Sequence, residues 1–296
     1  MRKISAMLLA SLLVLCTLAG CATDSPGNPT GTVNTSLRGP ITVVSREDGS
    51  GTRGAFIELF GIEVKNDDGS KKDMTTKEAI IADKTDIMMT NIAGDSNAIG
   101  YISLGSLNDS IKALQIDGAA ASIENVKNGS YQIQRPFNIA VKGEAEGLTK
   151  DFIEFVLSKE GQEVIAANKY IPVSEEAPAF DSSRPSGKIV VAGSSSVTPL
   201  MEKLREAYLV INPNAVIEVQ LGDSSSGMTM AMNGTCDIGM ASRALKDSEL
   251  AELTETAIAL DGIAVIVNNS NPLDGLTSEQ VKAIFTGAAL NWSDLA

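Results

Sequence analysis

The sequence contains no histidine and only three cysteines among its 296 residues. Without histidine, Ser-His-Asp and Cys-His catalysis are excluded, and so few cysteines leave no usual ligand set for zinc. Catalysis by carboxylates alone remains open. We therefore expect no metal and no other cofactor, and most routes to an enzyme are closed.

Positive charge is also scarce, because 24 Lys and Arg face 37 Asp and Glu, for a formal net charge of −13. A chain this acidic is a poor candidate for binding nucleic acid, whose phosphates require basic patches. It can bind a small anion only if the site relies on local dipoles rather than on net charge.

Long hydrophobic runs are absent except near the N-terminus. Residues 6–19 are apolar, but the run is shorter than the ~20 residues of a membrane-spanning helix, and it ends in Leu18-Ala19-Gly20-Cys21. The pattern predicts an export signal over residues 1–20. The segment Leu18-Ala19-Gly20-Cys21 resembles a bacterial lipobox, which would make Cys21 the lipidated first residue of the mature chain; the alternative is an ordinary signal peptide with an incidental cysteine. With Cys16 in the signal, Cys236 stands alone, which excludes a disulfide framework.

After a Pro/Gly/Ser/Thr-rich tether, residues 21–37, apolar runs alternate between strand-like and helical spacing, which predicts an α/β fold. We expect strands near residues 41–45, 98–104, 137–141, 188–192, 216–220 and 261–268, and helices near 53–60, 149–168, 199–211 and 277–287. Thr277 and Gln280 have the capping-box spacing at the start of the last helix. Residues 171–187 hold three prolines and four serines without periodicity, which predicts a linker.

Three turns rich in Gly, Ser and Thr each lie between a predicted strand and a predicted helix: residues 45–52, 192–199 and 222–227. Small residues let successive N–H groups point one way, and a helix N-terminus adds free donors and the positive end of its dipole. The hydroxyls add donors without charge, and Arg46 adds one cation. One such turn is usually only an N-cap, but three in one chain predict an oxyanion site. None is a Walker A loop, which disfavours nucleotide binding.

Several segments resemble the phosphate-binding proteins of the high-affinity phosphate ABC importer (the PstS-like family): residues 43–53, 97–105, 191–200, 236–243, 259–268 and 284–295. The resemblance covers nearly all of residues 38–170 and 187–296. It implies a two-lobed α/β periplasmic-binding-protein fold of type II, the Venus flytrap. It also implies an extracytoplasmic, lipid-anchored protein that captures inorganic phosphate between its lobes and delivers it to the permease subunits of an ABC importer. We expect a monomer.

The resemblance also implies phosphate ligands, residue by residue. The first turn would contribute Arg46, Ser50, Gly51 and Thr52, the second turn Ser195 and Ser196, and the third turn Ser224 or its neighbour Ser225. Asp48 would orient Arg46 through a short-range ion pair.

The order of the segments departs from the family, in which the segment resembling 187–296 comes first and the one resembling 38–170 follows. This chain would then be circularly permuted, with residues 171–187 joining the family's usual ends and the new termini close together. The alternative is a gene fragment or a shuffled copy. The permuted order predicts one lobe from residues 38–135 plus 267–296, carrying the Arg46 turn. The second lobe would comprise residues 136–266 with the joining linker, and the two crossovers would form a hinge.

Arg243 is a second departure, because many family members have at this position an Asp that accepts the proton of hydrogen phosphate and rejects sulfate. Either Asp48, Asp223 or Asp237 replaces that acceptor, or the selectivity is weaker; Arg243 would strengthen anion binding in general. The alternatives to phosphate delivery are binding of another tetrahedral oxyanion such as sulfate, a surface sensor or adhesin without transport, and an exported phosphatase. The missing histidine argues against the phosphatase.

Overall fold

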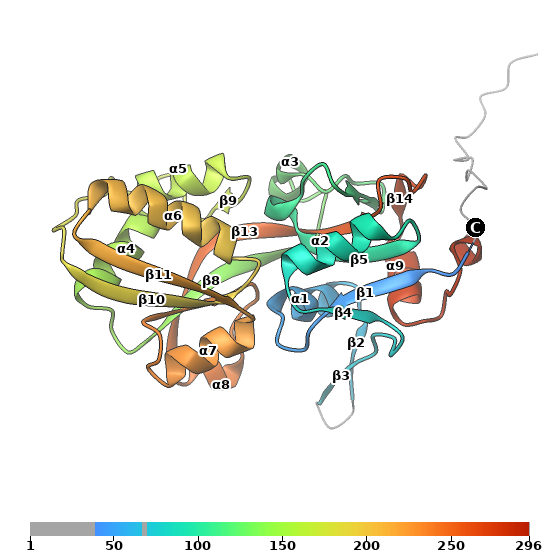
Figure 1. The fold of residues 1–296 in the computed structure, drawn as a ribbon, viewed down its shortest axis with the longest axis horizontal. Coiled ribbons are helices and arrows are strands. Elements are labelled where there is room, and N and C mark those ends of the chain that lie inside the picture. Colours follow the sequence, from blue (N-terminus) through green and yellow to red (C-terminus); the bar gives the residue numbers. More distant parts are fainter. Residues whose placement is uncertain (1–38, 67–69, 296) are drawn as a thin grey trace, which may run out of the picture. The chain divides into compact units, whose positions relative to one another are not determined.

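The computed structural model describes residues 39–66 and 70–295 of the chain (Figure 1). The predicted export signal, Cys21 and the tether lie outside the described residues. Within the described residues, no helix has the length and apolar character needed to cross a membrane.

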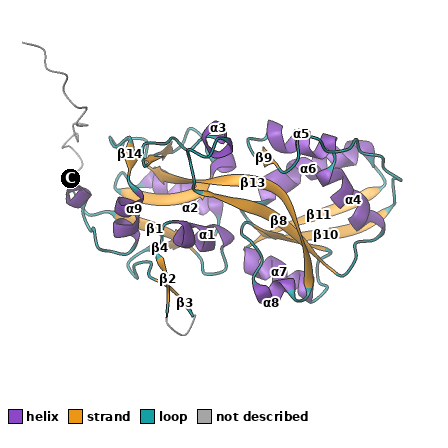
Figure 2. Cartoon of the chain, turned by 180° about the vertical axis from the view of Figure 1, so that it is seen from behind, coloured by secondary structure: helices purple, strands orange, loops and turns teal. Residues whose placement is uncertain are grey.

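Most strands belong to one continuous mixed sheet that runs through both halves of the described chain (Figure 2). Its order is β11 (Ala215–Gly222), β10 (Gly187–Ser194), β12 (Ile238–Ala241), β8 (Gln134–Lys142), β13 (Leu253–Val267), β5 (Ala98–Ser103), β1 (Thr42–Arg46) and β4 (Ile80–Ala82). The strands at each end pair in parallel, whereas β8 and β13 run antiparallel to each other and to their outer neighbours. Two long strands thus join two parallel-stranded halves, which confirms the predicted α/β class.

Helices pack around both halves of this sheet (Figure 1). One half carries α1 (Gly51–Leu59), α2 (Thr85–Gly94), α3 (Ile123–Lys127) and α9 (Ser278–Phe285), and the other α4 (Gly147–Leu157), α5 (Lys159–Ala167), α6 (Thr198–Ile211), α7 (Ser224–Met232) and α8 (Asp247–Leu250). The shorter elements are β2 (Glu63–Lys65), β3 (Lys71–Asp73), η1 (Leu104–Ser106), β6 (Lys112–Ala113), β7 (Gln115–Ile116), β9 (Ile171–Pro172), β14 (Gly275–Leu276) and η2 (Trp292–Leu295).

Two main hydrophobic cores lie on either side of the point where β8 and β13 pass from one half to the other. The first, around Phe56, comes mainly from residues 43–133 and 263–292, and we call this part the Arg46 lobe. The second, around Phe155, comes from residues 137–259, and we call this part the Ser195 lobe. The predicted boundary placed residues 263–266 in the second lobe, but they pack in the first core. The reason is that β13 runs unbroken through the crossover and extends into the Arg46 lobe.

The predicted helix over residues 149–168 is in fact two helices, and this prediction was wrong. Ser158 ends α4 with an extended backbone, and its hydroxyl accepts the N–H of Gly161 at 3.3 Å as the N-cap of α5. Serine is a preferred N-cap because its oxygen satisfies a donor that the helix leaves open. The apolar spacing continues across the break and conceals it. The capping box of Thr277 and Gln280 is present at the start of α9 and is confirmed.

The predicted linker lies along the Ser195 lobe and is tied to it. Phe180 packs edge-on against Phe155, with 5.3 Å between the ring centroids. The carboxylate of Asp151 accepts the hydroxyl of Ser182 at 2.7 Å and the N–H of Ser183 at 3.2 Å. Between β9 and β10 the segment is irregular, as its prolines predict, but these contacts hold it against α4.

The ends of the described chain lie side by side. The N–H of Ile41 donates to the carbonyl of Leu290 at 2.8 Å, and the N–H of Trp292 donates to the carbonyl of Gly39 at 3.3 Å. An antiparallel bridge between Pro40 and Asn291 completes the contact. Residues 39–41 and 290–292 are therefore neighbours, as the permuted order predicts for the new ends.

Candidate functional site

Each of the three predicted turns follows the carboxyl end of a strand and begins a helix. The first connects β1 to α1, with Ser50 as the N-cap. The second connects β10 to α6, and the third connects β11 to α7, where Asp223 and Ser226 form a capping box. The polar turns therefore collect where β1 of the Arg46 lobe and β10 and β11 of the Ser195 lobe end.

Side chains of the first two turns meet across the two lobes. Nη2 of Arg46 donates to Oγ of Ser195 at 3.0 Å. The hydroxyls of Thr52 and Ser196 lie 2.8 Å apart. Each contact joins residues about 145 positions apart in the chain, so the fold brings together what the sequence separates.

The third turn joins this group through Ser224, which is fully buried. Its Oγ accepts the N–H of Ser242 at 3.1 Å, and Oγ of Ser242 accepts from Oγ of Ser194 at 2.9 Å. A Cβ atom added to Gly51 would lie only 2.5 Å from Oγ of Ser224 and 2.8 Å from Oγ of Ser242. A side chain at position 51 would therefore force these two hydroxyls to move, so glycine favours the close approach of the first turn to the third.

We call the resulting group the hydroxyl cluster. It comprises Thr52, Thr85, Ser194, Ser195, Ser196, Ser224 and Ser242, all buried, together with the guanidinium of Arg46. Ser50 is buried beside it, where its oxygen accepts the N–H of Arg53 at 3.3 Å. Ser225 is only partly buried, and its hydroxyl accepts from Nη2 of Arg243 at 3.4 Å.

Arg46 is held at both its backbone and its side chain. The hydroxyl of Tyr101 accepts the N–H of Arg46 at 3.1 Å, and burial raises the pKa of Tyr101, so the phenol stays neutral. The carboxylate of Glu47 accepts Nε at 2.9 Å and Nη2 at 2.8 Å. Such charge-assisted paired bonds fix the plane of a guanidinium.

Asp48 does not orient Arg46, contrary to the prediction. Its carboxylate bonds to Nη1 of Arg53 at 2.8 Å, and its side chain is 97% exposed. The turn carries Asp48 outward to solvent, whereas Glu47, one residue nearer the strand, folds back onto the guanidinium. Glu47 is the carboxylate that sequence reasoning missed.

Arg243 lies at the edge of the hydroxyl cluster, but its charge is paired. Nη1 and Nη2 donate to the two carboxylate oxygens of Glu249 at 2.7 and 2.8 Å. Burial works to raise the pKa of Glu249, but the hydrogen bonds from Arg243 and the backbone of Lys246 outweigh it and hold that pKa below its ordinary value. Arg243 is therefore part of an ion pair within the Ser195 lobe.

The other predicted proton acceptors are also engaged elsewhere. Asp223 accepts the N–H of Ser226 at 2.8 Å as the N-cap of α7. Asp237 accepts the N–H of Val190 at 2.7 Å. All three candidate acceptors, Asp48, Asp223 and Asp237, therefore already bond to other groups of the described chain.

A buried ion pair lies at the crossover. Nη2 of Arg135, on β8, is 3.1 Å from Oδ2 of Asp261, on β13, and both side chains are 1% exposed. Nη1 of Arg135 also donates to the carbonyl of Ser242 at 3.1 Å, and Asp261 accepts the hydroxyl of Ser103 at 2.8 Å. The pair thus connects the hydroxyl cluster to the Arg46 lobe.

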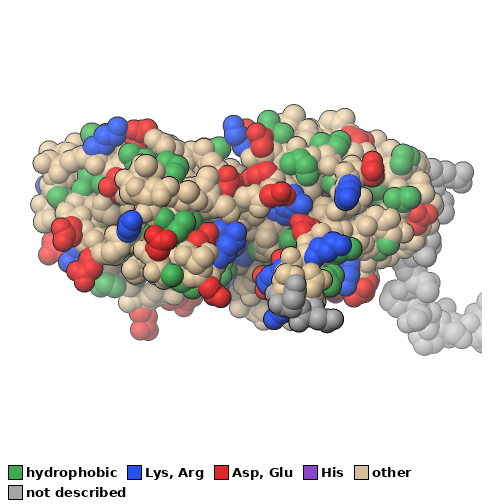
Figure 3. All heavy atoms as spheres, turned by 90° about the horizontal axis from the view of Figure 1, so that it is seen from below, with side chains coloured by type: hydrophobic (Ala, Val, Ile, Leu, Met, Phe, Trp, Pro, Cys, Tyr) green, Lys and Arg blue, Asp and Glu red, His purple; other side chains and the backbone are tan. Residues whose placement is uncertain are grey.

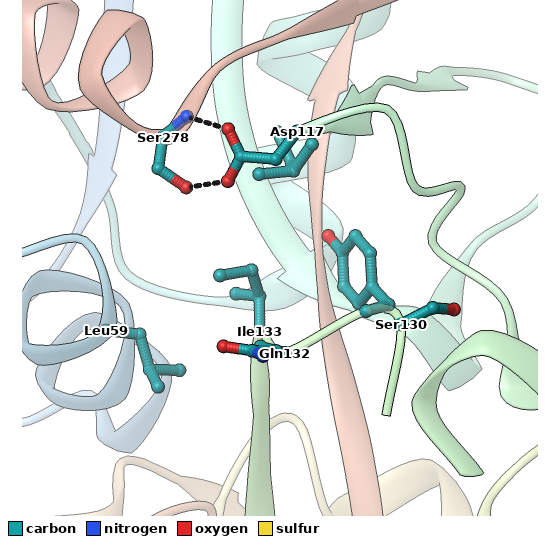
Figure 4. Close-up of a pocket in the computed structure, with 8 residues that line it drawn as sticks. Leu59, Asp117, Ser130, Gln132, Ile133 and Ser278 are labelled. Atoms are coloured by element: carbon teal, nitrogen blue, oxygen red, sulfur yellow. Dashed lines mark hydrogen bonds between the residues drawn. The ribbon is translucent and has the colours of Figure 1, made fainter. Parts of the chain in front are cut away.

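Cavities lie near these elements and elsewhere in the Arg46 lobe. A groove of about 820 Å³ is lined by α1, by β8 and by residues 243–247, so it borders both lobes; Figure 3 shows Lys and Arg side chains on both sides of a hollow between the two halves. A pocket of about 340 Å³ lies within the Arg46 lobe, where Asp117 accepts the N–H and the hydroxyl of Ser278 (Figure 4). It shares no residue with the hydroxyl cluster.

Among the described residues, no group of His, Cys, Asp and Glu could hold a metal ion.

Comparison with known proteins places the chain in a family. The model of the PBP superfamily domain matches residues 31–160 and 178–296. "Phosphate-binding protein PstS 2" of Streptococcus agalactiae is 50% identical over 297 residues, which cover 100% of this chain and 98% of that protein. The chain belongs to the PstS family of the PBP superfamily. This confirms the resemblance, and with it the expected periplasmic-binding-protein fold.

A solved structure and a more distant family member complete the comparison. The crystal structure of a phosphate ABC transporter, phosphate-binding protein from Streptococcus pneumoniae is 47% identical, covers 87% of this chain and 100% of its own, and superposes with a TM-score of 0.70. The Bacillus subtilis "Phosphate-binding protein PstS" is 35% identical over only 139 residues, 46% of this chain and 42% of that protein. Similarity to the streptococcal family members extends over nearly the whole chain, and similarity to the Bacillus protein over less than half.

Proposed function

We propose that this protein binds inorganic phosphate between its lobes, outside the cytoplasm, and delivers it to the permease of an ABC importer. The observation that carries the proposal is the buried hydroxyl cluster, in which Arg46 and Thr52 of one lobe meet Ser195 and Ser196 of the other. The names of the family members support phosphate as the ligand.

The chemistry of the cluster suits a tetrahedral oxyanion. Many neutral donors and one guanidinium can satisfy four oxygens in a chain whose net charge is −13. A hydrogen bond to a charged group contributes about 1.5–3 kcal/mol net, roughly twice the value of a neutral pair. Arg46, Ser50, Gly51, Thr52, Ser195, Ser196 and Ser224 are the proposed ligands, with Ser225 beside them.

Opening and closing of the lobes would admit the anion. The only strands that pass between the two cores in the described chain are β8 and β13, which makes them the natural hinge. Hinge closure around a ligand is the usual motion of two-lobed binding proteins. An anion bound by both lobes would favour the closed state, because only that state offers all its donors.

We also propose that the chain is circularly permuted relative to family members such as the Bacillus protein, and that the streptococcal members, which match it over nearly their whole length, share its order. A linear alignment to a protein with the two segments in the opposite order can follow only one of them, and the match to the Bacillus protein spans under half of each chain. The neighbouring ends of the described chain and the tied segment 171–187 fit this order.

Attachment to the membrane is proposed through a lipid on Cys21, with residues 21–37 as the tether. A single acyl chain holds a protein only reversibly, so stable attachment needs the full lipid modification. We propose a monomer, since one chain supplies every residue of the cluster.

Calorimetric titration of the protein with phosphate and with sulfate tests the proposed function. We expect one phosphate per chain, at micromolar or lower concentration. Equal affinity for sulfate would assign the site to tetrahedral oxyanions in general. Binding of neither anion would contradict the proposal, and steady release of phosphate from a phosphomonoester would favour the phosphatase.

A further inference from the structure

Thr85 lies in the hydroxyl cluster although it belongs to none of the three turns. It is the first residue of α2, in the Arg46 lobe, and the residue is only 6% exposed. Its Oγ1 is 3.4 Å from Nη1 of Arg46 and 3.4 Å from the Oγ atoms of both Ser195 and Ser196. One hydroxyl therefore contacts the cation of its own lobe and both serines of the other.

Arg46 determines which way the Thr85 hydroxyl points. A guanidinium only donates, so Oγ1 of Thr85 must accept from Nη1. The single hydroxyl proton is then left for an acceptor on the side of Ser195 and Ser196. Nη2 of Arg46 donates toward Ser195 on that same side, at 3.0 Å.

The pairing of Arg46 with Glu47 leaves one edge of the guanidinium facing the cluster. Glu47 accepts from Nε and Nη2, whereas Nη1 and the second proton of Nη2 face Thr85 and Ser195. An oxyanion that takes two bonds from this edge would lie against both hydroxyls. The hydroxyl proton of Thr85 is then available to one oxygen of the anion.

We propose that Thr85 is a further ligand of the oxyanion, donating its hydroxyl proton to the anion while it accepts from Arg46. The inference rests on the proposed function and adds a donor from a fourth segment of the chain. It predicts that the hydroxyl, not the shape of the side chain, determines the contribution of position 85.

Three variants separate these roles in calorimetric titrations with phosphate. Thr85→Val keeps the shape and removes the hydroxyl, Thr85→Ser keeps the hydroxyl, and Thr90→Val removes an exposed hydroxyl of the same helix that donates to the carbonyl of Asp86. We expect Thr85→Val to bind about tenfold or more weakly, since a bond to a charged group is lost. Thr85→Ser should stay within about threefold of wild type, and Thr90→Val should bind like wild type.

The outcomes distinguish this inference from the proposed function. Wild-type affinity in Thr85→Val, or an equal loss in Thr85→Ser, would overturn the role of Thr85 and leave the proposed function standing. If the wild-type protein binds neither phosphate nor sulfate, the proposed function fails and Thr85 has no anion to bind. Thr85→Ala serves as the second hydroxyl-free variant if Thr85→Val melts at a lower temperature, and the same tenfold loss is expected.

Discussion

Arg46, in the hydroxyl cluster, and Arg243, at its edge, are each paired with a carboxylate, but the two pairs use different edges of the guanidinium. Arg46 gives Nε and Nη2 to Glu47, and its Nη1 remains directed at the cluster. Arg243 gives both Nη1 and Nη2 to Glu249. Both pairs are charge-assisted, yet only Arg46 retains two donors toward the hydroxyls.

The difference shows that charge near a site does not make a ligand. A guanidinium has five N–H donors in a fixed plane, so the edge that a carboxylate occupies decides where the others point. From sequence, Arg243 is a cation that should strengthen anion binding. In the structure it belongs to an ion pair within the Ser195 lobe, donates to the carbonyl of Ala244 at 2.9 Å, and reaches a hydroxyl at Ser225, at 3.4 Å.

Replacing each arginine with lysine should give the largest difference in phosphate affinity between the two positions. Lysine keeps the charge but cannot bond Glu47 and two hydroxyls at once, so we expect Arg46→Lys to weaken phosphate binding by about 100-fold, as when one or two bonds to a charged group are lost. Arg243→Lys should stay within about threefold of wild type, because Arg243 makes no bond that the anion needs.

Arg184→Lys, at an exposed position in the segment 171–187, is the matched control for the lysine substitutions. Calorimetry with phosphate measures all three variants. A larger loss from Arg243→Lys than from Arg46→Lys would reverse the assignment of the two side chains.

A second test concerns the close approach of the two lobes. Gly51→Ala places a Cβ 2.5 Å from Oγ of Ser224 and 2.8 Å from Oγ of Ser242, which obstructs closure, and phosphate affinity should fall about tenfold. Gly94→Ala is the control, because no atom lies within 4 Å of its added Cβ. Titration of both variants, with thermal melts to check folding, gives the comparison. Equal affinities in Gly51→Ala and Gly94→Ala would mean that binding does not need this approach.

The smallest effect is expected in the pH dependence of stability. The pKa of Glu249 is held below its ordinary value, so its ion pair with Arg243 stabilises the fold above the unfolded pKa of about 4.3, and this contribution is lost as pH falls through the folded pKa. Glu249→Gln should therefore melt a few degrees below wild type at pH 7, on the order of 2–4 °C.

The difference between the two melting temperatures should shrink as the pH falls toward 3, because the carboxyl group of Glu249 then takes up a proton and its ion pair with Arg243 is lost. Melting curves of wild type and Glu249→Gln from pH 7 to pH 3 measure it. A difference that grows with acidity would contradict the direction of the pKa shift.

The sequence predicted the parts of the site that depend on local pattern. Each Gly/Ser/Thr turn before a helix is short and continuous, so Arg46, Ser195 and Ser224 could be identified without knowing where the strands lie. Thr85 and Ser242 could not, because neither lies in one of these turns and their contacts to Ser195 and Ser194 span 110 and 48 positions. No local pattern distinguishes Thr85 from other threonines at helix starts.

Local ambiguity explains the wrong predictions. Glu47 and Asp48 are adjacent acids in one turn, and only the path of the backbone decides which folds back onto Arg46. The apolar spacing of residues 149–168 continues through Ser158, so the break between α4 and α5 is visible only as a cap. The lobe boundary at residue 266 depends on how far a single unbroken strand, β13, extends into each core.

Whether phosphate binds in the hydroxyl cluster, between the two lobes, can be seen in a crystal structure of the protein grown with phosphate. We predict one anion within hydrogen-bond distance of Arg46 and of hydroxyls from both lobes, Thr52 and Thr85 on one side and Ser195 and Ser196 on the other. An anion bound beside Arg243 in the groove, with Arg46 still bonded to Ser195, would contradict the account.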